Sequence, residues 1–101
     1  MKKESAFQAG LVRKLRGFEW VKRVIKNDPN QIQGFPDLTV YLTNGKWALL
    51  ECKQHEAAKR QPNQQFYIQD MAESGFARFI YPENEEEILR ELSEYASGAG
   101  R

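Results

Sequence analysis

The stretch GFPDLTVYLTNGKWALLECK, residues 34–53, holds the pattern that decides the fold. Alternating apolar residues over 38–42 and a second apolar run over 46–53 predict two β-strands. Asn44-Gly45 lies between them and is the preferred two-residue turn of a β-hairpin, so we expect the strands to pair antiparallel. Such a hairpin brings the start of its first strand next to the end of its second.

Three ionisable side chains lie at those two ends. Asp37 precedes the first strand, just after the restricted backbone of Pro36, and Glu51 and Lys53 share one face of the second because residues two apart point the same way. Two carboxylates and an ammonium can hold Mg²⁺ against a phosphodiester and activate a water molecule. A solvated cross-strand charge pair is the alternative interpretation.

The remaining segments predict an α/β fold. Apolar spacing, turn residues and helix-start signals, including Asn84 with Glu87 as a capping box, place the elements along the chain. The expected order α-β-β-β-α-β-α gives a central mixed four-stranded sheet flanked by helices. We expect residues 1–96 to form a single domain and 97–101 a disordered tail. The segments are a helix over 4–16, a strand over 20–25, the hairpin, a loop over 54–61, a helix from 62 to before 75, a strand over 76–81 and a helix from 84 onward.

Two helical residues are further candidates for the site. Glu4 lies three residues before Phe7 and so shares the apolar face of the first helix, where it is either a helix-terminal carboxylate favoured by the helix dipole or a third acidic group of the site. Gln64 shares a helix face with Tyr67 and Ile68, so its amide is directed at the core or at the edge of the site.

Composition limits the class of protein. The chain has 101 residues, a net charge of +1 and no long apolar run or signal-like segment, so we expect a soluble, intracellular, cytoplasmic protein without membrane contact. Cys52 is the only cysteine, which excludes an intrachain disulfide. Basic residues gather in the first thirty positions and acidic ones in the last helix, a distribution that suits a protein with one face toward a polyanion.

Taken together, these residues resemble the PD-(D/E)XK nuclease superfamily. The resemblance depends on Pro36-Asp37 and on Glu51-Cys52-Lys53 on the next strand, together with Glu4 on the preceding helix and Gln64 on the following one. Within the superfamily the pattern is similar to minimal VRR-NUC nucleases, although the Val-Arg-Arg signature is absent, and to archaeal-type Holliday junction resolvases.

The resemblance implies a restriction-endonuclease-like core and a role for each matched residue. Asp37 and Glu51 would bind Mg²⁺, for which Mn²⁺ would substitute, and the backbone carbonyl of Cys52 is a third candidate ligand. Lys53 would position or activate the water, Glu4 would assist at the metal, and Gln64 would complete the catalytic set.

The expected function is a Mg²⁺-dependent DNA endonuclease, selective for branched or junction DNA and acting as a homodimer. Two alternatives stay open. One is a nucleic-acid-binding module of the same fold that does not cleave; the other is a metal-dependent hydrolase of a small phosphoester, which would need a concave pocket.

Overall fold

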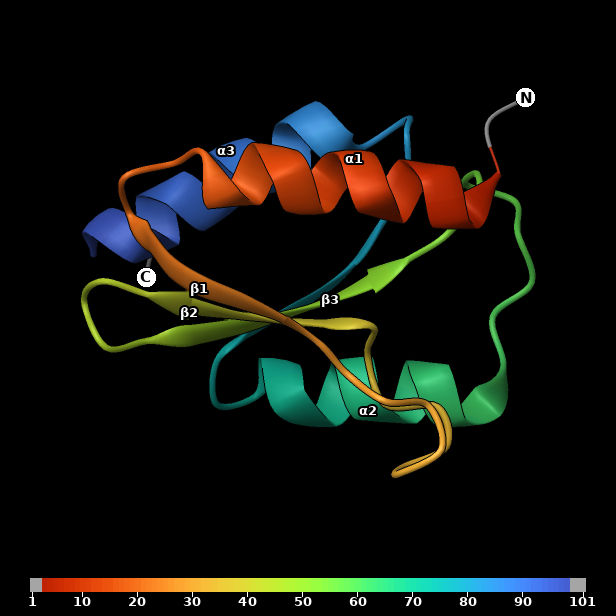
Figure 1. Cartoon of the computed structure of the whole chain (residues 1–101). Helices are drawn as coiled ribbons and strands as arrows, with labels where there is room; N and C mark the ends of the chain where they lie inside the picture. Colours follow the sequence, from red (N-terminus) through yellow and green to blue (C-terminus); the bar gives the residue numbers. More distant parts are fainter. Residues whose placement is uncertain (1–2, 99–101) are drawn as a thin grey trace.

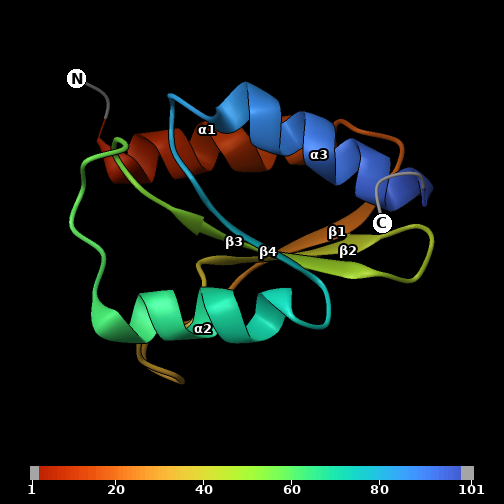
Figure 2. The same ribbon diagram turned by 180° about the vertical axis from the view of Figure 1, so that it is seen from behind.

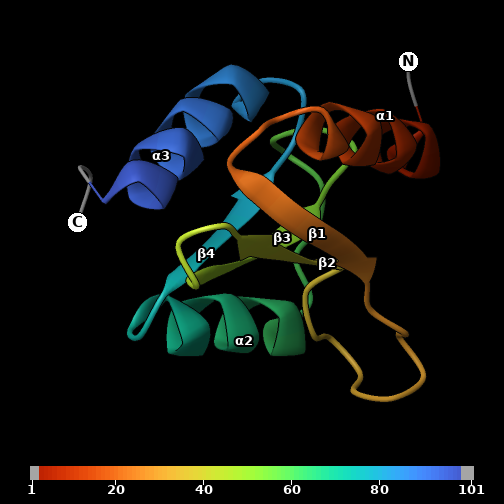
Figure 3. The same ribbon diagram turned by 60° about the vertical axis from the view of Figure 1, so that its left-hand side comes forward.

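The computed structural model describes residues 3–98 and confirms the predicted order of elements. Figure 1 shows the helices in two layers, with α1 and α3 on one side of the sheet and α2 on the other, and the views in Figures 2 and 3 agree. The elements are α1 (Glu4–Arg16), β1 (Val21–Lys26), β2 (Leu38–Leu42), β3 (Trp47–Cys52), α2 (Pro62–Ala72), β4 (Phe76–Ile80) and α3 (Glu85–Ser97).

The sheet is mixed, as predicted, with its strands in the order β1-β2-β3-β4. β1 pairs antiparallel with β2 and β2 antiparallel with β3, whereas β3 and β4 are parallel. A parallel pair needs a crossover connection, and here α2 supplies it. The crossover therefore places α2 against β3 and β4, on the face of the sheet opposite α1 and α3.

Two hydrophobic clusters hold the layers together. The larger one lies between the sheet and helices α1 and α3 and includes Leu11, Leu50 and Leu92. The smaller one, with Leu49 and Ile68, lies between the sheet and α2. Consecutive residues of β3 thus pack into opposite clusters, as the alternation predicted, and five of its six residues are buried because helices cover both faces.

Two local predictions are wrong. The hairpin loop has three residues, because the Leu42 N–H donates to the Lys46 carbonyl at 2.9 Å and the chain turns through Thr43-Asn44-Gly45, with only Gly45 at positive φ (89°). Asn44 thus stays outside the left-handed region that a two-residue Asn-Gly turn would require. Asn84 does not cap α3 with its side chain, which turns back to accept the Tyr81 N–H and to donate to the Phe79 carbonyl.

The C-terminal helix is longer than predicted. Ser97 is its last residue, and Gly98 follows in the left-handed conformation (φ 82°), so the part of the predicted tail at these two positions is ordered helix end. The rest of that tail, residues 99–101, lies outside the described residues. None of the helices between residues 3 and 98 has the length and apolar character needed to cross a membrane.

Candidate functional site

The hairpin brings Asp37 and Glu51 to the same end of the sheet. Leu38 is the partner of Leu50 in the antiparallel β2–β3 register. Asp37, which precedes Leu38, therefore lies opposite Glu51, which follows Leu50. Asp37 Oδ2 accepts a hydrogen bond of 2.8 Å from the backbone N–H of Cys52, which fixes its carboxylate against the end of β3. The predicted meeting of the two carboxylate-bearing positions is confirmed.

Gln64 joins Glu51 to Lys53 through its side-chain amide. Its Oε1 accepts from Lys53 Nζ at 2.8 Å and from the Gln61 N–H at 3.0 Å, and its Nε2 donates to Glu51 Oε2 at 2.8 Å. Because two donors face the amide oxygen and a carboxylate faces the nitrogen, only one orientation of the amide satisfies all three partners. Of the two positions predicted for the Gln64 amide, the core or the edge of the site, the structure shows the edge of the site.

Lys53 is buried at 6 % exposure, and its ammonium is held away from a direct ion pair. Besides the Gln64 amide, Nζ donates to the Lys59 carbonyl at 3.1 Å. The ion pairs within residues 3–98 include none between Lys53 and Asp37 or Glu51. The strand spacing predicted that Glu51 and Lys53 are neighbours, and the structure links them through an amide instead of a salt bridge.

Glu51 is the most unusual group of the site. It is 2 % exposed, and its Oε1 is the one buried side-chain oxygen or nitrogen in the described part of the chain that has no hydrogen-bond partner. Burial, with the negative charges of Asp37 and Glu4, raises the pKa of Glu51 from 4.5 to about 8 against the opposing effect of Lys53. An orphaned buried carboxylate oxygen is costly, and an added cation would relieve that cost.

The same surroundings also raise the pKa values of Asp37 and Glu4, by less than that of Glu51. Burial raises the pKa of Asp37, while the Cys52 N–H and the charge of Lys53 act to lower it. Burial and the charge of Asp37 raise the pKa of Glu4, again opposed by Lys53. Glu4 is electrostatically coupled to the site as predicted, and at the start of α1 it is still largely exposed to solvent.

Cys52 contributes its backbone to the site and its side chain to the core. The thiol packs in the large cluster on the α1 side of the sheet, and burial together with the charges of Asp37 and Glu51 raises its pKa. Its peptide N–H holds Asp37, and its carbonyl lies in the same strand between Glu51 and Lys53. The carbonyl therefore remains a candidate ligand, whereas the thiol lies on the face of β3 opposite to Glu51.

The donor set suits a hard divalent cation, though not as a complete cage. No three His, Cys, Asp or Glu side chains among residues 3–98 come close enough to form a metal site by themselves. Mg²⁺ is commonly held by one or two carboxylates and keeps several waters, so two carboxylates with one free buried oxygen fit it. A site of this kind is completed by a backbone carbonyl, water or substrate oxygens.

Sequence reasoning missed the backbone groups that hold Lys53 and Gln64. The Lys59 carbonyl lies in the polar loop that follows β3 and carries no sequence signal for this contact. The contact of the Gln61 N–H does have a sequence signal. Gln61 directly precedes the Pro that begins α2, and Gln64 lies three residues later, which is the spacing of a capping box.

Comparison with known proteins adds no family assignment. Searches against protein-family models, curated proteins and solved structures find no match for this chain.

Proposed function

We propose that this protein is a metal-dependent phosphodiesterase acting on DNA, an endonuclease of the PD-(D/E)XK type with a restriction-endonuclease-like core. The observation that carries the proposal is the linked set of Asp37, Glu51, Gln64 and Lys53 at one end of the sheet, with a buried carboxylate oxygen left without a partner. The confirmed order of elements around a mixed sheet supports the fold assignment.

Each residue has a chemical task in this proposal. Asp37 and Glu51, with the Cys52 carbonyl and with Glu4 nearby, would hold Mg²⁺, and Mn²⁺ would substitute. The bound cation would supply Lewis-acid activation of water and neutralise charge on the phosphate. Lys53 presents a fixed ammonium to stabilise negative charge, and because Gln64 holds it in place, little reorganisation is needed as that charge develops.

The substrate is proposed to be branched or junction DNA, cut by a homodimer. Two symmetric cuts across a junction need two sites, which a C2 dimer provides. The segregation of basic residues in the first third of the chain supports a polyanionic partner.

The test is cleavage of linear, nicked and four-way-junction DNA in Mg²⁺ or Mn²⁺. Asp37→Asn and Lys53→Gln should each lower the rate by at least about a hundredfold, the scale seen when one charge-stabilising group is removed. Asp70→Asn removes an exposed carboxylate of α2 and is the matched control, which should keep the wild-type rate. Circular dichroism and thermal melts establish that each variant is folded.

Full activity in both folded site variants would refute the site. Equal cleavage of the three substrates would refute junction selectivity and leave a general nuclease. Metal-independent binding without any product would identify a non-cleaving module of this fold.

One observation favours a second candidate, hydrolysis of a small phosphoester. A hollow of about 400 Å³, lined by Gln33, Gly34 and residues 61–64, lies beside the Gln64 amide and could receive a small ligand. Turnover of bis(p-nitrophenyl) phosphate without DNA cleavage, lost in Asp37→Asn, would favour this candidate over the nuclease.

A further inference from the structure

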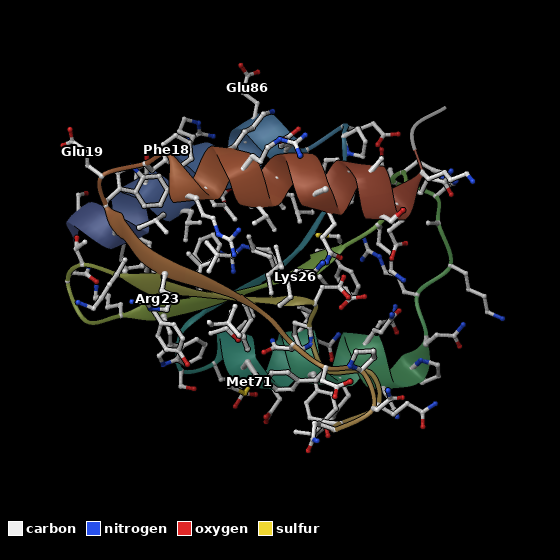
Figure 4. The ribbon with its side chains drawn as sticks, viewed as in Figure 1. Phe18, Glu19, Arg23, Lys26, Met71 and Glu86 are labelled. Atoms are coloured by element: carbon white, nitrogen blue, oxygen red, sulfur yellow. The ribbon has the colours of Figure 1, made fainter. Side chains whose placement is uncertain are left out.

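We infer that the outer edge of β1 is a binding site for the phosphate backbone of a nucleic acid that approaches the carboxylate site from this side. The inference rests on the proposed function and goes beyond it by assigning a surface outside the site. The edge is defined here as Lys22, Arg23 and Lys26 of β1 with Arg16 at the end of α1. Figure 4 shows Arg23 and Lys26 along β1, between α1 and α2 in that view.

The edge leads directly to the carboxylates. β1 is an outer strand of the sheet, and its last residue, Lys26, pairs with Leu38, the residue after Asp37. The next residue, Asn27, donates its backbone N–H to the Asp37 carbonyl at 2.8 Å. A strand of nucleic acid lying along β1 therefore reaches the end of the sheet that carries Asp37.

The cations of this edge have no acidic partners among the residues that the structure describes. Lys22, Arg23 and Lys26 are exposed, and none of them takes part in the ion pairs or side-chain hydrogen bonds found across residues 3–98. Within the described residues, the hydrogen bonding of Arg16 is limited to a long contact of 3.5 Å from Nη2 to the Val24 carbonyl. By contrast, Lys14 on the other side of α1 pairs with Glu85 at 2.8 Å.

The spacing of the edge matches a phosphate backbone. Lys22 and Lys26 are four residues apart, which at a rise of roughly 3.3 Å per residue is about 13 Å. One strand of B-DNA carries a charge for about every 3.4 Å of helix axis, so each cation of the row can meet a different phosphate. A hollow of about 440 Å³, lined by Arg16 and residues 21–25, follows the same edge.

A second copy of the chain fits this edge less well than a polyanion does. An outer strand exposes unpaired backbone groups that could pair with another strand, and charged residues and β-bulges oppose such pairing. Here the register shifts between Val21 and Arg23, leaving Lys22 as the extra residue of a bulge, and pairing β1 with itself would bring lysines and arginines together. The charge of the edge thus selects an anionic partner.

The test measures binding without cleavage. A fluorescein-labelled 20-bp DNA duplex is titrated in Ca²⁺ at several salt concentrations with wild type, with Lys22→Gln/Lys26→Gln and with the control Lys14→Gln/Arg90→Gln. Both double variants remove two positive charges, but the control residues lie in ion pairs with Glu85 and Glu94. Sedimentation of the same three proteins gives their oligomeric state.

Loss of two phosphate contacts should make the slope of log K against log salt shallower by about 1.8 in the β1 variant, or roughly a 60-fold loss of affinity at 0.1 M salt. The control should keep the wild-type slope. Equal changes in both variants, no change in either, or no binding by the wild type would overturn the inference. A dimer that strengthens in the β1 variant would also overturn it, by identifying edge pairing between copies.

The two proposals fail separately. Cleavage that requires Asp37 with an unchanged salt slope would overturn the phosphate site and leave the nuclease proposal standing. A shallower salt slope in the β1 variant, without any metal-dependent cleavage product, would support the phosphate site and overturn the nuclease proposal.

Discussion

Replacing Glu51 with Gln should stabilise the metal-free protein at alkaline pH. The carboxyl is 2 % exposed, has one unpartnered oxygen and has a pKa near 8 in the folded protein against 4.5 for the ordinary group. Each unit of pKa difference is worth about 1.4 kcal/mol, so the cost of ionising this buried group on folding is about 3–5 kcal/mol above pH 8. That is a large share of the 5–15 kcal/mol typical of a domain.

The direction of the pH dependence follows from the raised pKa. Folding favours the protonated carboxyl, so the stability that Glu51 contributes is fully present below pH 4.5 and is lost as the pH rises through 8. Asp37 and Glu4, whose pKa values are also raised, change in the same direction. An amide at position 51 does not ionise and can still accept the Gln64 Nε2–H, so most of this dependence should disappear in Glu51→Gln.

Urea denaturation in EDTA at pH 5, 7 and 9 measures this effect directly. The free energy of unfolding of the wild type should fall by about 3–5 kcal/mol between pH 5 and pH 9, and that of Glu51→Gln by much less. At pH 9, Mg²⁺ should restore stability to the wild type more than to the variant, because a ligand of the folded state stabilises it. If the free energy of unfolding of the wild type did not change with pH, or changed equally in both proteins, the conclusion that Glu51 is buried and resists ionisation would be refuted.

Two further predictions concern the amide bridge and a close backbone contact. Gln64→Leu removes the hydrogen bonds that Gln64 makes to Glu51 and Lys53, so we expect a loss of about 1–3 kcal/mol in urea denaturation and at least a tenfold lower cleavage rate; an unchanged rate would remove the amide from the site. Gly34→Ala should destabilise more than Gly45→Ala, by about 1 kcal/mol or more, because both have positive φ but only a Cβ at Gly34 meets Asn63; equal melting temperatures would contradict this.

The sequence predicted the fold well wherever a period-2 or period-3.6 pattern reached across a whole element. β3 is the clearest case, since its alternation assigned Leu49 and Leu50 to opposite faces and each packs in a different cluster. Local turn chemistry was less reliable. Asn44-Gly45 favours a two-residue turn, yet one more residue is looped out, and Asn44 instead donates its side-chain amide to the Ala96 carbonyl of α3 at 2.7 Å.

The positions of the site residues were predictable, but their connections were not. Hairpin register alone is enough to bring Asp37 to Glu51. The link from Lys53 to Glu51 depends on how far α2 lies from β3 and on the course of the loop that supplies the Lys59 carbonyl, and neither is encoded in a local pattern. The burial of Glu51 also depends on tertiary packing and not on a local pattern, because it follows from packing on both faces of the strand.

The crossover between β3 and β4 explains why core and site are built from the same elements. A parallel neighbour requires a crossover connection, here a helix across one face, and that helix begins at the end of the sheet where the chain leaves β3. α2 therefore starts beside Glu51 and Lys53, with its third residue, Gln64, in reach of both. Ile68, one helical turn later on the same side, packs into the cluster beneath. The contact that fixes the helix on the sheet thus also fixes the amide between the carboxylate and the ammonium, so a substitution that shifts α2 should disturb both groups at once.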